Sequence, residues 1–336
     1  MSFSFDQLEH PIVQAPMGGG PGTPALAAAV SGAGGLGFLA AGYKTADAVR
    51  AEIRELRELT DRPFGVNLFV PSEPADPAVV ERYAETLRSE AERCGTDLGE
   101  PRHDDDGWEE KLAVVVDERV PVISFTFGCP PESVLARVEQ AWVTVTTPAE
   151  AAIARAAGAD ALVVQGIEAG AHRGSFVDEG DSGLALLPLL QLVRRTTHLP
   201  LVATGGLMTA PAVAAVIAAG AVAAQLGTAF LLAPEAATST VHRAVLGGDA
   251  DTALTRAFTG RTARGIVNRF MLDHGAQAPS AYPEVHHLTA PLRAAARERS
   301  DPEAVNLWAG QGHALARELP AAELVRELSS SLSHST

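Results

Sequence analysis

The sequence predicts a (β/α)8 barrel, also called a TIM barrel, with a mostly helical region after it. Short apolar segments alternate with helical segments, and about eight such strands precede residue 235, as in a closed barrel. Segments 156–159 and 218–221 both read Ala-Ala-Gly-Ala, and each precedes a short strand containing glutamine, as expected for consecutive βα units. The chain has 336 residues, which is enough for one barrel and a further region. An open doubly wound sheet is the alternative.

The strands and helices follow from apolar runs and their punctuation. Four to eight apolar residues bounded by glycine, proline or polar residues are typical of buried parallel strands. Threonine followed by proline marks a helix start, as at Thr23 with Pro24 and at Thr147 with Pro148. We expect strands at 12–15, 36–40, 64–69, 120–127, 142–145, 161–164, 201–203 and 223–228. We expect helices at 25–31, 46–59, 78–93, 131–138, 148–157, 184–196 and 210–219.

Segment 32–37 matches the dinucleotide-binding pattern G-x-G-x-x-G. That motif requires a strand before it and a helix after it. Here a helix precedes the glycines and a strand follows them, so we interpret the segment as a helix stop and a tight turn. A Rossmann nucleotide site is rejected.

Two domains are expected. Residues 1–235 form the barrel, which carries an irregular acidic insert near 94–107 with three consecutive aspartates at 104–106. Without ligands at a defined spacing, these aspartates are interpreted as a solvated loop. Residues 236–336 form the mostly helical accessory region or lid, part of which is expected to pack back on the barrel.

Composition excludes several classes of function. The formal charge is −15 and no basic stripe is present, which argues against nucleic-acid binding. Cys94 and Cys129 form neither a disulfide framework nor a metal motif, and no H-x-x-x-H spacing occurs, so no metal is expected. No signal peptide or apolar run of about 20 residues is present. We expect a cytoplasmic protein without membrane contact, and the sequence leaves a homodimer open.

The loop after the strand at 161–164 carries the best candidates for chemistry. It presents Gln165, Glu168, His172 and Arg173 on a glycine-rich backbone. An imidazole with an ordinary pKa near 6.5 suits proton abstraction, so His172 is the candidate catalytic base. Arg173 is the candidate for holding an anionic substrate. The alternative is a surface loop whose histidine and arginine are merely solvated.

Two glycine turns suggest a phosphate site. Gly205 and Gly206 follow the seventh predicted strand, and Gly227 and Thr228 follow the eighth. In barrels these two loops commonly hold a phosphate with backbone N–H groups. Each pair alone is also explained as a simple turn.

Amide side chains at strand ends suit a neutral heteroaromatic ring such as a flavin. Asn67 and Gln165 have this position, and Ala15, Pro16 and Met17 follow the first strand, where they are expected to contact one face of the ring. Core packing explains Met17 equally well.

Several of these segments together resemble the nitronate monooxygenases, formerly called 2-nitropropane dioxygenases, a family of FMN-dependent barrels. They keep their order along the chain at 14–17, 67, 124–128, 165–174, 204–206, 225–228 and 308–312. The resemblance implies oxidation of alkyl nitronates by O₂, through one-electron transfer to the flavin and without a pyridine nucleotide. It implies FMN contacts from Asn67, Gln165, Gly170, Gly206, Gln225, Leu226, Gly227 and Thr228, with His172 as the base or substrate-orienting group.

One departure is Ala171, where a second glycine is usual before the histidine. The implied partners are a small nitronate or nitroalkane, with propionate 3-nitronate as one candidate, and O₂. Two other functions stay open: an NAD(P)H-dependent flavin enoyl-thioester reductase, and a non-catalytic barrel that binds a phosphorylated ligand.

Overall fold

The computed structural model describes residues 3–178 and 183–332 and confirms the predicted barrel. Its eight parallel strands follow the sheet order β1-β9-β8-β6-β5-β4-β3-β2. The strands are β1 (Ile12–Gln14), β2 (Gly37–Ala40), β3 (Phe64–Phe69), β4 (Val122–Thr126), β5 (Ala141–Val145), β6 (Ala161–Gln165), β8 (Leu201–Thr204) and β9 (Ala223–Leu226). All eight lie within predicted strands or within one residue of them.

The barrel closes between β1 and β2 through a short contact. Val13 and Leu36 form a single parallel bridge. Beside it, the Gln14 side chain replaces a missing ladder partner, since its Oε1 accepts a hydrogen bond from the Phe38 N–H at 3.0 Å. Gln14 is fully buried, so this amide completes the backbone hydrogen bonding at the seam.

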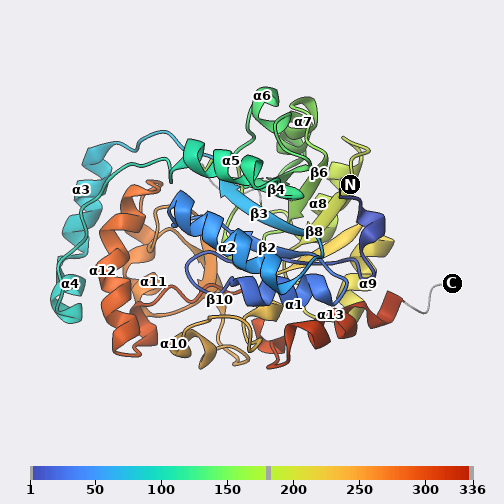
Figure 1. Ribbon diagram of the computed structural model, residues 1–336. Coiled ribbons are helices and arrows are strands. Elements are labelled where there is room, and N and C mark those ends of the chain that lie inside the picture. Colours follow the sequence, from blue (N-terminus) through green and yellow to red (C-terminus); the bar gives the residue numbers. More distant parts are fainter. Residues whose placement is uncertain (1–2, 179–182, 333–336) are drawn as a thin grey trace.

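Helices surround the barrel, and the last of them comes from the end of the chain. They are α1 (Pro24–Gly32), α2 (Ala46–Leu59), α5 (Trp108–Asp117), α6 (Glu132–Leu135), α7 (Pro148–Ala156), α8 (Leu186–Arg194), α9 (Ala210–Ala218) and α13 (Ala321–Ser329). The side chains of Thr23 and Thr147 cap their helices as the sequence predicted. Helix α13 packs against α1 and α9 (Figure 1). It therefore occupies the position that the helix after the eighth strand, β9, has in a regular (β/α)8 barrel.

The region between β9 and α13 contains strands as well as helices. Its helices are α10 (Thr240–Arg243), α11 (Arg269–His274) and α12 (Glu284–Glu298). Strands β10 (Thr252–Thr255) and β11 (Ala263–Ile266) form an antiparallel sheet with β7 (Ala171–His172), which lies in the loop after β6. No strands were expected here, because these segments are short and lack clear alternation.

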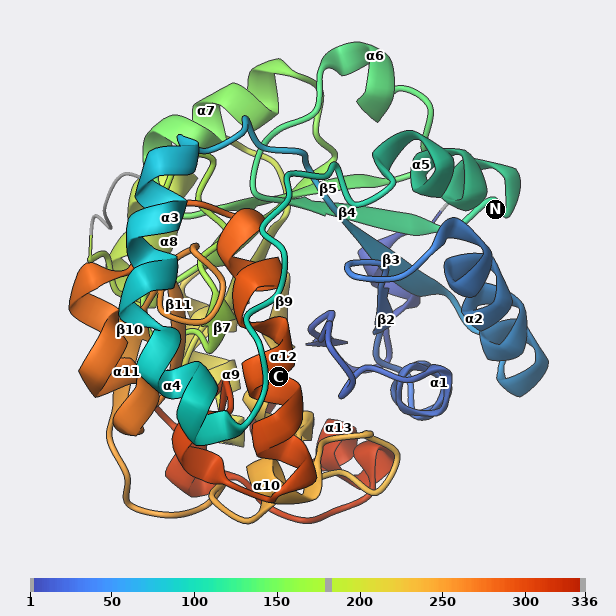
Figure 2. The ribbon, with the colours of Figure 1, turned by 90° about the vertical axis from the view of Figure 1, so that its left-hand side faces the viewer.

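The accessory region also takes in residues that the sequence analysis assigned to the barrel. The predicted helix at 78–93 is two helices, α3 (Pro77–Thr86) and α4 (Arg88–Cys94), which lie beside α12 (Figure 2). Tyr83 and Leu87 share a hydrophobic cluster with Phe258 and Val285. Residues 77–94 therefore pack with the region that follows residue 235, although they precede it in the chain.

The acidic insert near 94–107 runs along α12 instead of forming a free loop. The Gly99 N–H donates to the Leu288 carbonyl at 2.8 Å, and His287 Nε2 lies 2.7 Å from Asp104 Oδ2. Lys111 Nζ lies 2.7 Å from Asp106 Oδ2. The aspartates predicted to be solvated therefore have protein partners. No helix within the described residues is long and apolar enough to cross a membrane.

Candidate active site

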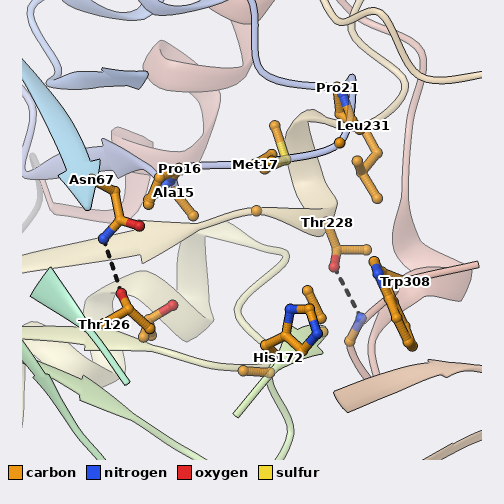
Figure 3. Close-up of a pocket in the computed structure, with 18 of the residues that line it drawn as sticks. Ala15, Pro16, Met17, Pro21, Asn67, Thr126, His172, Thr228, Leu231 and Trp308 are labelled. Carbon is orange, nitrogen blue, oxygen red and sulfur yellow. Dashed lines mark hydrogen bonds between the residues drawn. The ribbon is translucent and has the colours of Figure 1, made fainter. Parts of the chain in front are cut away.

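A cavity of about 450 Å³ opens at the carboxyl ends of the barrel strands, a size typical of small-molecule and cofactor sites. Figure 3 shows Asn67 and Thr126 on one side of it, Thr228 and Trp308 on the other, and His172 between them. Every candidate site residue except Arg173 lines this cavity: Ala15, Pro16, Met17, Asn67, Gln165, Gly170, His172, Gly205, Gly206, Gln225, Leu226, Gly227 and Thr228. The strand order brings these residues together from five separate segments.

The two glycine turns have the geometry of an anion cradle. Gly205 and Gly206 adopt positive φ values of 129° and 67°, which favour glycine. A Cβ on Gly206 would lie 3.0 Å from the Glu168 Cβ, so the turn is also crowded. Within the described residues, the N–H groups of Gly206 and Thr228 donate to no protein acceptor. Thr228 is the first residue of a short 3-10 helix, so its N–H lies at the positive, N-terminal end of that helix.

The amide side chains differ in how they are held. Asn67 Nδ2 donates to Ser124 Oγ and Thr126 Oγ1, both at 2.9 Å. Gln165 Nε2 donates to the His172 carbonyl at 3.1 Å. The Gln225 side chain makes no hydrogen bond to any described residue, although it is buried. Gln225 therefore keeps its donors and acceptor for a ligand, whereas Gln165 mainly ties the histidine loop to β6.

His172 is a neutral imidazole at the centre of the site. Its Nε2 lies 2.9 Å from Thr259 Oγ1. The centroid of its ring lies 5.6 Å from the Phe127 ring centroid and 5.7 Å from the Trp308 ring centroid. Burial, followed by the charges of Arg261 and Arg293, lowers the pKa of His172 to about 3. An uncharged imidazole can accept a proton or a hydrogen bond from a ligand.

Arg173, the residue predicted to hold an anionic substrate, does not line the cavity. It is buried, its backbone N–H donates to the Thr262 carbonyl at 2.8 Å, and its guanidinium donates to the Gln165 carbonyl. Successive side chains of a strand point to opposite faces. With His172 facing the cavity, Arg173 must face away from it.

The cations that reach the cavity come from α12, which the sequence analysis did not single out. His286, Ala290, Arg293 and Arg297 line it, and their spacing of four, three and four residues places them on one helix face. That spacing is the signal that could have identified them. Among the described residues, no aspartate or glutamate lines the cavity.

Arg293 is held firmly and keeps one nitrogen without a protein partner. Its Nε donates to Thr289 Oγ1 at 3.1 Å, and Nη2 donates to the His286 carbonyl at 2.8 Å. Burial, followed by the charge of Arg297, lowers the pKa of Arg293 to about 10, so the guanidinium stays charged at neutral pH. Nη1 has no hydrogen-bond partner within residues 3–178 and 183–332, which leaves it available to an anion.

The remaining lining residues also bear on the chemistry of the site. His242 also lines the cavity. In the part of the chain that the structure describes, no three His, Cys, Asp or Glu side chains gather in a way that could hold a metal ion. The site therefore offers backbone N–H groups, free amides, a neutral imidazole and guanidinium groups, which together suit an anionic organic ligand.

Comparison with known proteins places this site in a family. A model of the family described as nitronate monooxygenase matches residues 2–331. The chain is 43% identical to a nitronate monooxygenase of Pseudomonas aeruginosa, covering 96% of this chain and 95% of that protein. A solved nitroalkane oxidase from Streptomyces ansochromogenes superposes with a TM-score of 0.95 at 53% identity, covering 98% and 97% of the two chains. FabK from Thermotoga maritima is less similar, with a TM-score of 0.77, 26% identity and coverage of 98% and 95%.

Proposed function

The chain belongs to the nitronate monooxygenase family, and we propose that it uses bound FMN to oxidise small alkyl nitronates with O₂. The observation that carries this proposal is the cavity itself. A neutral imidazole and a buried guanidinium face one space in which the described residues place no carboxylate, in a chain of formal charge −15. Such a space favours anions with a reactive carbon near the imidazole.

The residues present fit FMN. The phosphate would be held by the N–H groups around Gly205, Gly206, Gly227 and Thr228, two of which have no protein acceptor among the described residues. The unpaired amide of Gln225 would contact the polar edge of the ring, with Ala15, Pro16 and Met17 against one of its faces. When bound, the flavin supplies the electron acceptor for the nitronate and passes the electrons to O₂.

Arg293 and His172 would hold the substrate. The nitronate oxygens carry the negative charge, so the free Nη1 of Arg293 pairs with them. For a neutral nitroalkane, His172 takes the proton from the carbon beside the nitro group, and the electron pair of that C–H bond forms the C=N bond of the nitronate. The pKa of His172 is lowered first by burial and then by the charges of Arg261 and Arg293, and a negative charge that develops on the bound nitro group opposes the contribution of the two arginines.

The absorption spectrum of the purified protein, supplemented with FMN and then desalted, tests the first half of the proposal. We expect a flavin spectrum at one equivalent. Oxygen uptake with propionate 3-nitronate, measured without NADH or NADPH, tests the second half. Failure to retain the flavin contradicts the proposal. Flavin bleaching by NAD(P)H under anaerobic conditions, without nitronate turnover, favours the enoyl-thioester reductase instead.

A further inference from the structure

Thr259 lies behind the candidate base and belongs to the accessory region. It sits in the turn that joins β10 to β11, it is buried, and it also lines the cavity. The Thr259 N–H donates to the Arg256 carbonyl at 3.2 Å, and the adjacent Gly260 carbonyl accepts the Ala281 N–H at 2.8 Å. The turn is therefore fixed on both sides, and the position of the Thr259 hydroxyl is set by the fold.

The Thr259 hydroxyl makes three contacts, and together these select one arrangement of protons. Oγ1 lies 3.3 Å from the Arg261 carbonyl oxygen, 3.4 Å from the Arg261 backbone N–H nitrogen and 2.9 Å from His172 Nε2. A hydroxyl has one proton and two lone pairs. The carbonyl can only accept and the backbone N–H can only donate. All three contacts are satisfied at once only if the hydroxyl donates to the carbonyl and His172 Nε2 carries a proton.

The opposite tautomer loses one of these bonds. If Nε2 were the unprotonated nitrogen, the Thr259 proton would have to point at it, and the Arg261 carbonyl would lose its only hydrogen-bond donor among the described residues. The hydrogen bond at one imidazole nitrogen sets the state of the other. His172 Nδ1 has no protein partner within residues 3–178 and 183–332, and the ring lines the cavity.

We propose that Thr259 is a positioning residue that holds His172 as the Nε2–H tautomer, so that the lone pair of Nδ1 serves as the proton acceptor. This inference rests on the proposed function for its consequence, since an imidazole in the other tautomer would present an N–H to the substrate carbon. The assignment of the tautomer itself does not depend on the reaction. The accessory region therefore contributes to the chemistry as well as enclosing the cavity.

The experiment combines ¹⁵N NMR of histidine-labelled, FMN-free protein with steady-state kinetics of the FMN-loaded enzyme. The His172 signals are identified by their loss in His172→Ala. We expect a protonated, pyrrole-type Nε2 and an unprotonated, pyridine-type Nδ1 in the wild type. Thr259→Val has the same shape without the hydroxyl, so we expect mixed tautomers and a fall in kcat of about tenfold, with KM changed by less than about threefold.

Two further variants separate positioning from packing. Thr259→Ser restores the hydroxyl, so we expect the wild-type tautomer and a kcat within about threefold of the wild type. Thr255→Val removes a buried hydroxyl from β10 that bonds the Ala257 N–H and does not line the cavity, and it should leave the tautomer unchanged.

A wild-type spectrum with a protonated Nδ1, or a Thr259→Val protein with unaltered tautomer and kcat, overturns the inference. If Thr259→Val does not fold, the wild-type spectrum and Thr259→Ser decide it. An Nε2–H spectrum in a protein that does not oxidise nitronates contradicts the proposed function and leaves the tautomer assignment standing.

Discussion

His172 pairs with Ala263 in the antiparallel ladder between β7 and β11, so the candidate base lies in the accessory sheet and outside the ladder of the barrel sheet. The proposed phosphate cradle, in contrast, consists of loops that directly follow β8 and β9. The cavity therefore lies between two parts of the fold with separate tasks: the barrel provides the cradle, and the accessory region orients the imidazole and supplies Arg293. Each part can be tested with its own substitutions.

Gly227→Ala tests the cradle with little disturbance of the fold. Gly227 has a φ of −110°, which alanine adopts without strain, and a Cβ there would meet only Ala15 Cβ at 3.5 Å and Met17 Sδ at 4.0 Å. The methyl group would occupy space beside the proposed phosphate. We expect FMN affinity to fall by about tenfold, or about 1.4 kcal/mol, in a fluorescence titration.

Gly32→Ala is the control for this change, since a Cβ at Gly32 meets nothing within 4 Å and the residue does not line the cavity. Equal FMN affinities for the two variants would place the phosphate elsewhere.

Arg293→Gln tests the anion contact. Removing a buried charge that pairs with a substrate anion costs about 2 kcal/mol or more, so we expect kcat/KM for propionate 3-nitronate to fall at least about 30-fold. Arg293→Lys keeps the positive charge but loses the planar, two-pronged donor geometry of the guanidinium, so it should retain part of the activity. Arg54→Gln on the exposed face of α2 is the control, because its side chain is 63% exposed. An unchanged kcat/KM in Arg293→Gln would show that Arg293 does not bind the substrate.

The buried histidines predict how stability depends on pH. The pKa values of His172 and His242 are lowered to about 3 and about 4, chiefly by burial. Below about pH 6.5 the unfolded chain therefore binds protons that the native state does not, so stability falls as the pH falls. Each histidine contributes up to about 1.4 kcal/mol per pH unit in this range.

Urea unfolding of the FMN-free protein between about pH 6.5 and pH 5 measures this slope. Carboxylates with lowered pKa values, such as Glu90 and Glu118, lose their stabilising contribution only at lower pH, so they do not affect the slope in this window. His172→Ala should give a shallower slope than the wild type. A wild-type free energy of unfolding that stays constant over this window would show that these histidines titrate normally.

Ala171→Gly tests the strain beside the candidate base. Ala171 has a φ of 63°, a left-handed conformation that costs a non-glycine residue about 1 kcal/mol or more. Glycine relieves that strain but adds freedom to the unfolded chain, so we expect a net gain of up to about 1 kcal/mol in chemical denaturation. Ala278→Gly, at a φ of −68°, should destabilise the protein instead. Matching losses in both variants would mean that position 171 carries no strain.

Much of the barrel could be predicted because each strand is a short buried apolar run with clear turn residues at its ends. The strand ends then brought Asn67, Gln225 and the glycine turns into one cavity, as the sequence suggested. The position of Arg173 outside the cavity could not be predicted, because it depends on the alternation of β7, a two-residue strand whose pairing partner lies about 90 residues away in sequence. Local pattern could not reveal that ladder.

Thr259 and Arg293 were missed for a related reason. Both reach His172 only through the tertiary packing of the accessory region, and a lone threonine in a turn has no distinctive pattern. The segment at 77–94 was assigned to the barrel because it follows β3 directly, yet its apolar face packs with Val285 and Phe258. Contacts of this kind depend on the whole fold.

His172→Ala, with FMN retention and oxygen uptake measured on the same sample, tests the central claim most directly. We expect the variant to keep the flavin spectrum and FMN affinity of the wild type, while its turnover of a neutral nitroalkane falls by at least about 100-fold, as for loss of a general base. A folded variant that loses the flavin would show that the imidazole serves cofactor binding, and one that keeps full turnover would show that His172 is not the base.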